Sequence, residues 1–307
     1  MKQSRGLSVP FRAAFRHTLP PAYEFARAGG RLLADRIEYA SCRAPGDLDY
    51  HALPFLRSLI DSGFPVVAEG DELVVKVSEG LNLRVPMFLA FAGLGMVDER
   101  FVRREFERFD VDDALVVDVG ANIGDSAIYF ITRGAYCVVA YEPFSATADV
   151  AARNISSNGL DARIQLERVG LGKADTTRQA AYDPQQPHIA SAVEDHHDAA
   201  KTVEVHLTTL ANALSRASSI AGSDHRIVLK VDCEGCEGEI FSSPLDLDGV
   251  GSVLVETHSD RLQRQVVAQL EAAGFACAVV SEAPHLSTAV LLATRPGSDG
   301  KPAIKKS

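Results

Sequence analysis

The sequence of 307 residues contains no run of about 18 apolar residues, the shortest length from which a membrane-spanning helix is normally built. Its first residues also lack the continuous apolar core of a secretory signal peptide. These two absences leave a membrane span and export without support in the sequence. We therefore expect a cytoplasmic protein.

Cysteine is scarce, with five residues scattered along the chain: Cys42, Cys137, Cys233, Cys236 and Cys277. Their odd number and irregular spacing argue against a disulfide framework, so reduced thiols are expected. Cys233 and Cys236 have the C-x-x-C spacing of zinc and redox sites, but no second pair lies at ligand spacing. We interpret both as small packing residues.

Positive charge is in deficit, because 31 Lys and Arg against 41 Asp and Glu give a net charge of −10 and a pI near 5.4. Such a protein has no overall attraction to a phosphate backbone or an anionic membrane, which argues against nucleic acid as a partner. The arginines of the first 36 residues could form a local basic face or an ordinary solvated helix face. Apolar residues make up 46%, enough for one large core with a smaller appendage.

The sequence divides into three parts. Residues 1–97 predict an N-terminal cap, residues 98–295 the main domain, and residues 296–307, which carry Gly, Pro, Ser and Lys with little apolar content, a disordered tail. The elements expected in the cap are short helices before residue 40, a helix at 53–62 and a β-meander at 66–67, 72–77 and 81–85.

Strand-like and helix-like segments alternate from residue 115 onward, after a charged segment at 99–108 that is predicted to be helical. This alternation is typical of a doubly wound α/β fold, in which helices cover both faces of a parallel sheet. Residues 173–202 are predicted to be irregular. The expected strands are 115–120, 137–142, 163–171, 203–207, 226–232, 252–257, 275–281 and 288–294, and the expected helices are 124–134, 145–158, 208–217, 236–242 and 260–273.

The segment Asp118–Gly124 lies where an apolar strand ends and a helix begins, the position at which open α/β sheets bind their ligands. Gly120 and Gly124 permit a sharp turn and a close approach of the backbone to a ligand. The free amides of the following helix favour a negative group. Asp118 could accept a ligand's amino group or cap the loop amides, and a purely structural turn is the alternative for the glycine pair.

Glu142 ends the next strand, where a carboxylate can accept hydrogen bonds from both ribose hydroxyls of an adenosine. Asn122 stands where the G-x-G-x-x-G fingerprint of dinucleotide sites requires its second glycine, so a nucleoside without pyrophosphate fits better. A nicotinamide-dependent oxidoreductase stays an alternative, because Glu142 would serve its ribose equally well. The residues expected to bind the cofactor are Asp118, Gly120, Ala121, Asn122, Gly124, Asp125, Glu142 and Pro143.

Six blocks of sequence follow one another: VVDVGANIGDSAIYFITRGA (Val116–Ala135), VVAYEP (Val138–Pro143), the pair Asn154 and Asn158, TLANAL (Thr209–Leu214), LKVDCEGCEGEI (Leu229–Ile240) and VLVETH (Val253–His258). Together they resemble the FkbM-type S-adenosylmethionine-dependent methyltransferases over about residues 95–280. The resemblance implies the class I methyltransferase fold, a Rossmann-like and mostly parallel seven-stranded sheet. It also implies S-adenosyl-L-methionine as cofactor and methylation of a hydroxyl on a sugar, glycolipid or natural product.

In the fifth block, Lys230 and Asp232 alternate on one face of a strand whose carboxyl end should lie beside the cofactor. Methyl transfer is an in-line displacement, so the protein mainly has to align the acceptor and remove its proton. Asp232 could do either. With Glu234 and Glu237 it could hold a divalent cation, or the two glutamates could stabilise the start of the next helix through its dipole.

Glu256 and His258 alternate at the end of the next strand and should share the side on which the acceptor binds. An imidazole with an ordinary pKa of about 6.5 could take the acceptor's proton near neutral pH, or could simply bond a backbone carbonyl. The expected catalytic residues are therefore Asp232, Glu256 and His258. A cofactor-binding regulatory subunit without catalysis is an alternative that these residues disfavour.

The predicted irregular segment 173–202 contains His188 and the run Glu194–Asp198. Adjacent histidines on an irregular chain rarely point at one ion, so we interpret the segment as a solvated loop. Because it joins the third and fourth strands near the crevice, we also hypothesise that it folds over the acceptor as a lid. The expected partner is a small hydroxylated acceptor, and the sequence does not indicate an oligomeric state.

Overall fold

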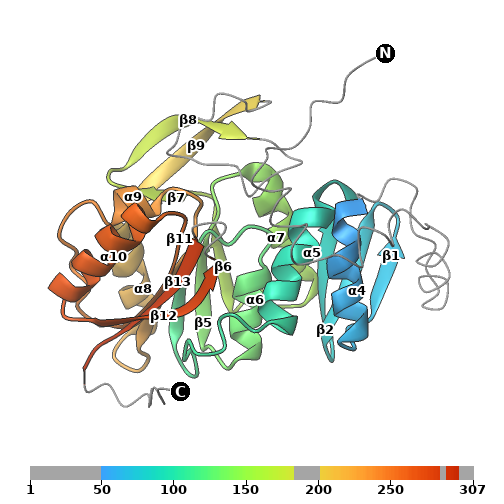
Figure 1. The fold of residues 1–307 in the computed structure, drawn as a ribbon, viewed down its shortest axis with the longest axis horizontal. Coiled ribbons are helices and arrows are strands. Elements are labelled where there is room, and N and C mark those ends of the chain that lie inside the picture. The colour runs from blue at the N-terminus through green and yellow to red at the C-terminus, as the bar shows by residue number, and fades with distance from the viewer. Residues whose placement is uncertain (1–49, 183–200, 284–287, 297–307) are drawn as a thin grey trace.

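A seven-stranded sheet in the order β12-β13-β11-β10-β4-β5-β6 forms the centre of the molecule (Figure 1). The computed structural model describes residues 50–182, 201–283 and 288–296. This sheet, with helices on both faces, confirms the predicted fold class. Its strands are β4 (Leu115–Val119), β5 (Cys137–Tyr141), β6 (Ile164–Glu167), β10 (Ile227–Val231), β11 (Val250–Thr257), β12 (Ala276–Ala283) and β13 (Thr288–Thr294).

The order of the strands reverses between β4 and β10. β4 pairs in parallel with β5 on one side and with β10 on the other, and the chain then runs outward to β6 in one direction and to β11 in the other. β13 lies antiparallel between β11 and β12. In open α/β sheets, ligands bind outside the carboxyl ends of the strands at such a reversal.

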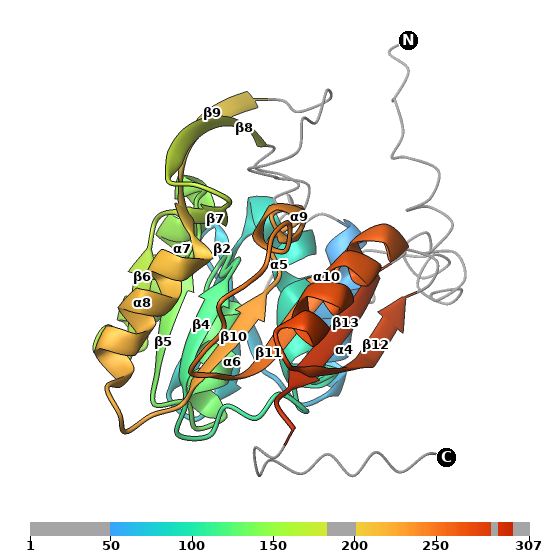
Figure 2. The same ribbon diagram turned by 90° about the vertical axis from the view of Figure 1, so that its left-hand side faces the viewer.

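The apolar strands separate two hydrophobic layers, because successive side chains of a strand point to opposite faces. In β4, Val116 packs into the layer under α6 and α7, whereas Leu115 and Val117 pack into the layer under α8, α9 and α10 (Figure 2). The bounds of these helices are α6 (Asp125–Thr132), α7 (Ser145–Ser157), α8 (Leu210–Ala221), α9 (Glu237–Ile240) and α10 (Asp260–Ala272).

The part before the main sheet contains the predicted meander, here an antiparallel three-stranded sheet in the order β1-β2-β3. Its core residues Leu56, Val85 and Leu94 belong to the same buried cluster as Ile123 and Phe130 of the main sheet's layer. This layer is therefore continuous between the two parts. The elements are α4 (Leu53–Asp61), β1 (Val66–Glu69), β2 (Glu72–Ser78), β3 (Leu81–Pro86) and α5 (Ala90–Val97), with 3-10 turns at Tyr50–Ala52 and Met87–Leu89.

Two asparagines, Asn154 of α7 and Asn158 at its C-terminal cap, hydrogen-bond the edge of β3 that is not paired with β2. Asn158 accepts from the amide of Asn82 (2.8 Å) and donates to its carbonyl (2.7 Å), and Asn154 does the same at Arg84 (2.8 and 3.1 Å). Asn154 also donates to the carbonyl of Ile123, at the start of α6 (2.9 Å). Because a side-chain amide carries the same donor and acceptor as a peptide group, the pair replaces a neighbouring strand.

Several sequence predictions need correction. The charged segment 99–108 is not one helix, because a π-helical turn at Asp98–Val102 is followed by bends and turns. The predicted strand 163–171 is split into β6 and β7 (Gly170–Gly172), which belong to different sheets. Residues 176–182, predicted to be irregular, form β8. Ala180 and Tyr182 are the buried residues of β8, so its alternating pattern is too short to stand out.

β8 (Thr176–Tyr182) and β9 (Lys201–Thr209) form an antiparallel arm, with β7 parallel to β9 at its base. The arm projects past the carboxyl ends of the main strands (Figures 1 and 2). A ring stack between Phe144 and Tyr182 anchors it.

The helices expected before residue 40, the basic N-terminal face, Cys42, His188, Glu194–Asp198 and residues 297–307 lie outside the described residues. Among the residues that the structure describes, no helix has both the length and the apolar character needed to cross a bilayer.

Candidate functional site

The glycine loop after β4 is fastened to both neighbouring strands. The amides of Gly120 and Ala121 donate to the carbonyl of Tyr141 in β5 (both 3.0 Å), and the amide of Asp232 after β10 donates to Val119 (3.0 Å). Gly120 has a φ of +83°, and a Cβ at this position would overlap the backbone carbonyl of Asp232. Contact with the neighbouring strand β10 therefore requires this glycine, and close approach of a ligand to the same backbone stays a prediction.

Gly124 at the other end of the loop also has a left-handed φ, of +84°. A Cβ there would lie 3.4 Å from the Cα of Ala151 in α7, so the glycine lets α6 begin close to its neighbouring helix. Asn122 is left-handed as well, at φ +46°, a conformation that asparagine tolerates better than most residues. The loop is thus a tight turn that its neighbours define on two sides.

Glu142, the residue predicted to bind the ribose, organises the turn. Its Oε2 accepts a hydrogen bond from the amide of Asn122 (3.0 Å), while Oε1 accepts from the amide of Phe144 and the hydroxyl of Thr147 (both 2.9 Å). A carboxylate can accept about four hydrogen bonds, so Oε2 keeps the capacity for one more. Burial raises the pKa of Glu142, and the hydrogen bonds from Phe144, Thr147 and Asn122 oppose that shift.

Two of the polar acceptors in this region suit a ligand that donates hydrogen bonds. The Oδ1 atom of Asn122 is buried and accepts no hydrogen bond from the described residues. The backbone amide of the same residue, Asn122, donates to the Oε2 atom of Glu142, so the two acceptors lie in one region. An adenosyl ligand carries hydroxyl and amino donors, so its chemistry matches these acceptors.

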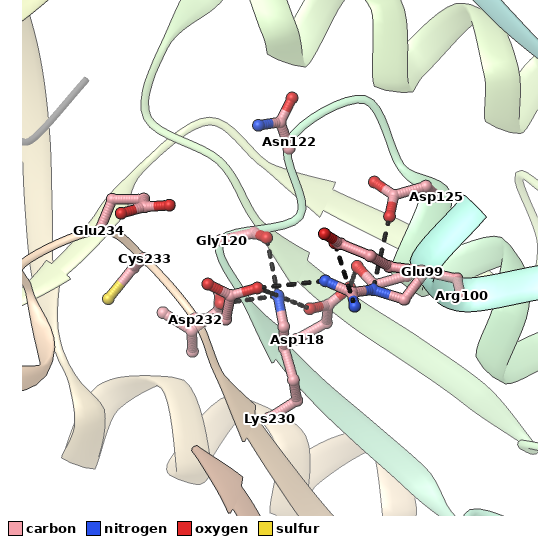
Figure 3. Close-up of polar contacts among 12 residues, drawn as sticks. Glu99, Arg100, Asp118, Gly120, Asn122, Asp125, Lys230, Asp232, Cys233 and Glu234 are labelled. Atoms are coloured by element: carbon pink, nitrogen blue, oxygen red, sulfur yellow. Dashed lines mark hydrogen bonds and ion pairs between the residues drawn. The ribbon is translucent and has the colours of Figure 1, made fainter. Parts of the chain in front are cut away.

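Asp118 is fully buried below the loop, where its Oδ2 accepts from the hydroxyl of Ser126 (2.6 Å) and its Oδ1 lies 3.1 Å from Lys230 Nζ. The ammonium of Lys230 also donates to the carbonyl of Gly120 (2.8 Å; Figure 3). It donates to the carbonyl of Val119 as well (3.2 Å). A buried lysine therefore clamps the end of β4 from its neighbour β10. Contact of Asp118 with a ligand's amino group stays a prediction.

Arg100, from the π-helical turn Asp98–Val102, enters the same site. Its side chain is buried, donates to Asp232 Oδ2 (3.4 Å) and lies 3.7 Å from Asp125 Oδ2 (Figure 3). On its other side it pairs with Glu105 (3.3 Å) and stacks over the ring of Phe106, 3.8 Å from the ring centre. Sequence reasoning missed this residue, because nothing in a charged segment marks one arginine as buried against groups far along the chain.

The two cations determine the charge of Asp232. Burial raises the pKa of this carboxyl group, but Lys230 at 3.6 Å and Arg100 at 3.4 Å lower the pKa by more than burial raises it. The net shift is therefore downward. For Lys230, burial lowers the pKa, but Asp118 and Asp232 outweigh burial and the net shift is upward. Asp232 is therefore ionised at neutral pH, with Lys230 and Arg100 both facing its Oδ2.

Glu234 and His258 bring a second group of titratable side chains to Asp232. His258, one residue beyond β11, has its Nε2 3.3 Å from Glu234 Oε2, and its Nδ1 is 3.9 Å from Glu237 Oε1. One ligand atom each from Asp232, Glu234 and His258 lie within 4.8 Å of one another. Burial raises the pKa of Glu234 to about 8, against an opposing effect of His258.

Glu237 does not join that group of ligand atoms. Its fully buried carboxylate accepts hydrogen bonds from the amides of Cys233 and Gly235 (both 2.8 Å), in the turn just before α9. Glu256, at the end of β11, is close enough to Asp232 for the two charges to interact, and burial raises its pKa well above the ordinary value. Of the three possible cation ligands, Asp232 and Glu234 therefore lie together with His258, whereas Glu237 holds the turn before α9.

Cys233 and Cys236 form a disulfide in this turn, with their Cα atoms 5.6 Å apart. The expectation of two reduced packing residues is wrong at this position, because the turn brings the two cysteines into the range of Cα distances that a disulfide spans. Cys137 and Cys277 are free thiols, as expected.

The structure thus assembles most of the predicted site at one place. Lys230 joins Asp118 of β4 to Asp232, and Arg100 joins Asp125 of α6 to Asp232, with Gly120 and Asn122 in the loop between β4 and α6 (Figure 3). Ala121 is wholly buried in the loop, and Pro143 packs near Gly170 behind Glu142. Lys230, Ser126 and Thr147 complete the hydrogen bonds of Asp118 and Glu142 although sequence reasoning gave them no role.

Residues 118–277 of the chain match the family model described as "Methyltransferase FkbM domain", which is just over half of the sequence. The chain belongs to the FkbM methyltransferase family. As an FkbM methyltransferase it is an enzyme that uses S-adenosylmethionine as its cofactor, and the acceptors of Glu142 and Asn122 fit that cofactor's donors.

A named relative of this FkbM methyltransferase is "Methyltransferase 1" of Beauveria bassiana (strain ARSEF 2860), which is 27% identical over 210 residues, covering 60% of this chain and 82% of the relative. Among solved structures, the ribosomal protein L11 methylase of Lactobacillus delbrueckii subsp. bulgaricus has a TM-score of 0.37 at 15% identity, covering 67% of this chain and 79% of its own. TrmK of M. capricolum in complex with S-adenosyl-homocysteine has a TM-score of 0.35 at 9% identity, and the match covers 63% of this chain and 68% of the TrmK chain.

Proposed function

We propose that this FkbM methyltransferase methylates a hydroxyl oxygen on a small metabolite, sugar or natural product. The observation that supports this most is the convergence of Asp232, Glu234 and His258 beside the glycine loop, at the carboxyl ends of β10 and β11. A hydroxyl is a weak nucleophile that must lose its proton as it reacts. A carboxylate and an imidazole at the acceptor position meet that requirement.

The cofactor would lie over the glycine loop between Glu142 and Asp232. Bound there, S-adenosylmethionine supplies a methyl carbon that its sulfonium has already activated. Oε2 of Glu142 would accept one ribose hydroxyl, and Oδ1 of Asn122 would accept a further donor. The other proposed contacts are Asp118, Gly120, Ala121, Gly124, Asp125 and Pro143.

Asp232, Glu256 and His258 are the proposed catalytic residues. Because Lys230 and Arg100 hold Asp232 through Oδ2, its other oxygen can orient the acceptor hydroxyl. The oxygen–carbon bond forms as the carbon–sulfur bond breaks, the electron pair of that bond stays on sulfur, and the hydroxyl proton passes to His258 or Glu256. The net negative charge of the chain favours a small molecule over nucleic acid as the acceptor.

A labelled-methyl transfer screen tests the proposal. The protein is incubated with methyl-labelled S-adenosylmethionine and panels of sugars, hydroxylated metabolites, amines and thiols, and mass spectrometry locates the added methyl group. We expect label on a hydroxyl oxygen. Transfer to amines or thiols alone would contradict O-methylation.

A further inference from the structure

We propose that Asp232, Glu234 and His258 form a binding site for one divalent first-row transition-metal cation, next to the methyl acceptor. The inference rests on the proposed function only for the role of the ion, because the site itself follows from the side chains. The three residues come from two strand ends, β10 and β11, and their ligand atoms all lie within 4.8 Å of one another. Ligands about 2.1 Å from one ion lie roughly 3 to 4 Å apart.

The existing contacts leave room for such an ion. Within the described part of the chain, the ion pairs of Asp232 with Lys230 and Arg100 both end at Oδ2, so Oδ1 faces away from these cations. Glu234 is 39% exposed and can rotate by the small amount that closes the set. The two ion pairs hold the carboxylate of Asp232 in place, whereas the exposed side chain of Glu234 can change its conformation.

His258 has the surroundings of a metal ligand. Its Nε2 faces Glu234 at 3.3 Å, while its Nδ1 faces the buried carboxylate of Glu237 at 3.9 Å. A metal-bound histidine typically has its second ring nitrogen directed at a carboxylate, which orients the ring. Glu237 is itself held by the amides of Cys233 and Gly235, so the orienting group is rigid.

The charge around the site independently favours a cation. The buried and half-buried carboxylates of the site outnumber its two permanent cations, Arg100 and Lys230, and among the described residues the ion pairs of these cations end at carboxylates other than Glu234 and Glu237. A cation is attracted to the carboxylates that Arg100 and Lys230 leave unpaired. The carboxylates concerned are Asp118, Asp125, Asp232, Glu234, Glu237 and Glu256.

The donor set indicates the class of metal. Imidazole favours Zn²⁺, Fe²⁺ and related ions, whereas carboxylate oxygens favour Mg²⁺, Ca²⁺ and Mn²⁺. A mixed set of two carboxylates and one imidazole fits Mn²⁺, Fe²⁺ or Zn²⁺ better than Mg²⁺ or Ca²⁺. With three protein ligands, coordination positions remain for water or for the acceptor's hydroxyl, whose pKa the ion would lower. Because His258 is then a ligand, the hydroxyl proton passes to Glu256 in the metal-bound enzyme.

Electron paramagnetic resonance of Mn²⁺ tests the site without an activity assay. Full-length protein, prepared without thiols or chelators so that neither competes for the ion, is titrated with Mn²⁺ and the signal of the free ion is followed. We expect one Mn²⁺ per chain, displaced by Zn²⁺ at lower concentrations than by Mg²⁺. In His258→Gln and Asp232→Asn, we expect affinity to fall at least tenfold. The exposed controls His206→Gln and Asp161→Asn should bind as the unchanged protein does.

Two results would overturn the metal site: no saturable Mn²⁺ binding, or equal affinity in His258→Gln. Circular dichroism and binding of S-adenosyl-homocysteine check that each variant is folded. The labelled-methyl screen on metal-stripped protein separates the two proposals. If the protein methylates a hydroxyl but does not bind Mn²⁺, the metal site is refuted and O-methylation stands. If it binds Mn²⁺ but methylates only amines or thiols, O-methylation is refuted and the metal site stands.

Discussion

The guanidinium of Arg100 donates a hydrogen bond to the carboxylate of Asp232 across 132 residues of sequence (3.4 Å). This contact joins the segment that precedes the main sheet to the carboxyl end of β10. Arg100 also neutralises Asp125, at the start of α6. A residue outside the six characteristic blocks therefore takes part in the electrostatics of the site.

Replacing Arg100 should destabilise the protein strongly. Arg100→Ala leaves Asp125 and Asp232 buried with one cation fewer, and breaking a buried ion pair in this way typically costs about 3–5 kcal/mol. Urea unfolding measures the loss. The control Arg57→Ala removes an exposed i,i+4 pair with Asp61 and should change stability by less than about 1 kcal/mol. A similar small change for Arg100→Ala would contradict the burial and pairing of this side chain.

Gly120→Ala should cost more than the left-handed backbone alone explains. Gly120 and Gly159 both have positive φ, but a Cβ at Gly120 overlaps the carbonyl of Asp232, whereas a Cβ at Gly159 meets nothing within 4 Å. Gly159→Ala should therefore lose about 1 kcal/mol, the ordinary cost of a left-handed alanine. Thermal unfolding of the two variants side by side measures the difference. Equal losses would show that the loop can move away from β10.

Glu142→Gln should weaken binding of S-adenosyl-homocysteine. The amide of glutamine keeps the shape of the side chain but removes its charge. One carboxylate oxygen becomes an NH₂ group, which cannot accept the hydrogen bond from Asn122 if it replaces Oε2, or those from Phe144 and Thr147 if it replaces Oε1. Since a hydrogen bond to a charged group contributes about 1.5–3 kcal/mol, we expect affinity to fall roughly tenfold or more. Calorimetry measures it, with exposed Glu204→Gln as control. Unchanged affinity would remove Glu142 from the cofactor site.

Asp232→Asn should abolish turnover while leaving most of the affinity for S-adenosyl-homocysteine. The cofactor side of the site stays intact, because Lys230 keeps Asp118 and Arg100 keeps Asp125 and Glu105 as partners. Steady-state methyl transfer and calorimetry on the same preparation measure the two properties. Full turnover in the variant would refute the catalytic role of Asp232, and Asp161→Asn serves as the exposed control.

Glu99 should make stability fall as the pH rises through neutrality. Burial raises its pKa from the ordinary 4.5 to about 7 in the folded protein, in spite of the opposing charge of Arg100. The protonated form is thus favoured by folding, so its contribution is complete below pH 4.5 and is lost as the pH rises through 7. Glu99→Gln should unfold at nearly the same temperature as the unchanged protein at pH 4.5 and at a higher temperature at pH 8. No gain at pH 8 would contradict the shift.

The strands and the loop were predictable because their signals are local. β4 is wholly apolar but for Asp118, it is followed by two glycines, and Glu142 comes directly after the next strand. β8 was missed because its alternation is confined to its last residues. Arg100 was missed because its burial depends on Asp125 and Asp232, which only the folded chain brings near.

The site also shows where local signals mislead. The sequence singled out Gly120 for a ligand, whereas the structure shows that the backbone of Asp232 already requires a glycine at this position. The sequence contains both residues, but only the pairing of β4 with β10 brings the backbone of Asp232 beside residue 120 and so explains why that residue is a glycine. The same holds for Cys233 and Cys236, whose spacing permits a disulfide, a metal site or simple packing, and whose pairing depends on the turn between them.

The side-chain amides of Asn154 and Asn158 have a consequence for association. An exposed strand edge is a template on which a further chain can add by main-chain hydrogen bonds. On β3, two of the backbone positions that such a chain would use are already occupied by Asn154 and Asn158. Recruitment of a foreign strand to the N-terminal sheet is therefore directed to β1, and the border with the catalytic domain is closed to edge-to-edge aggregation.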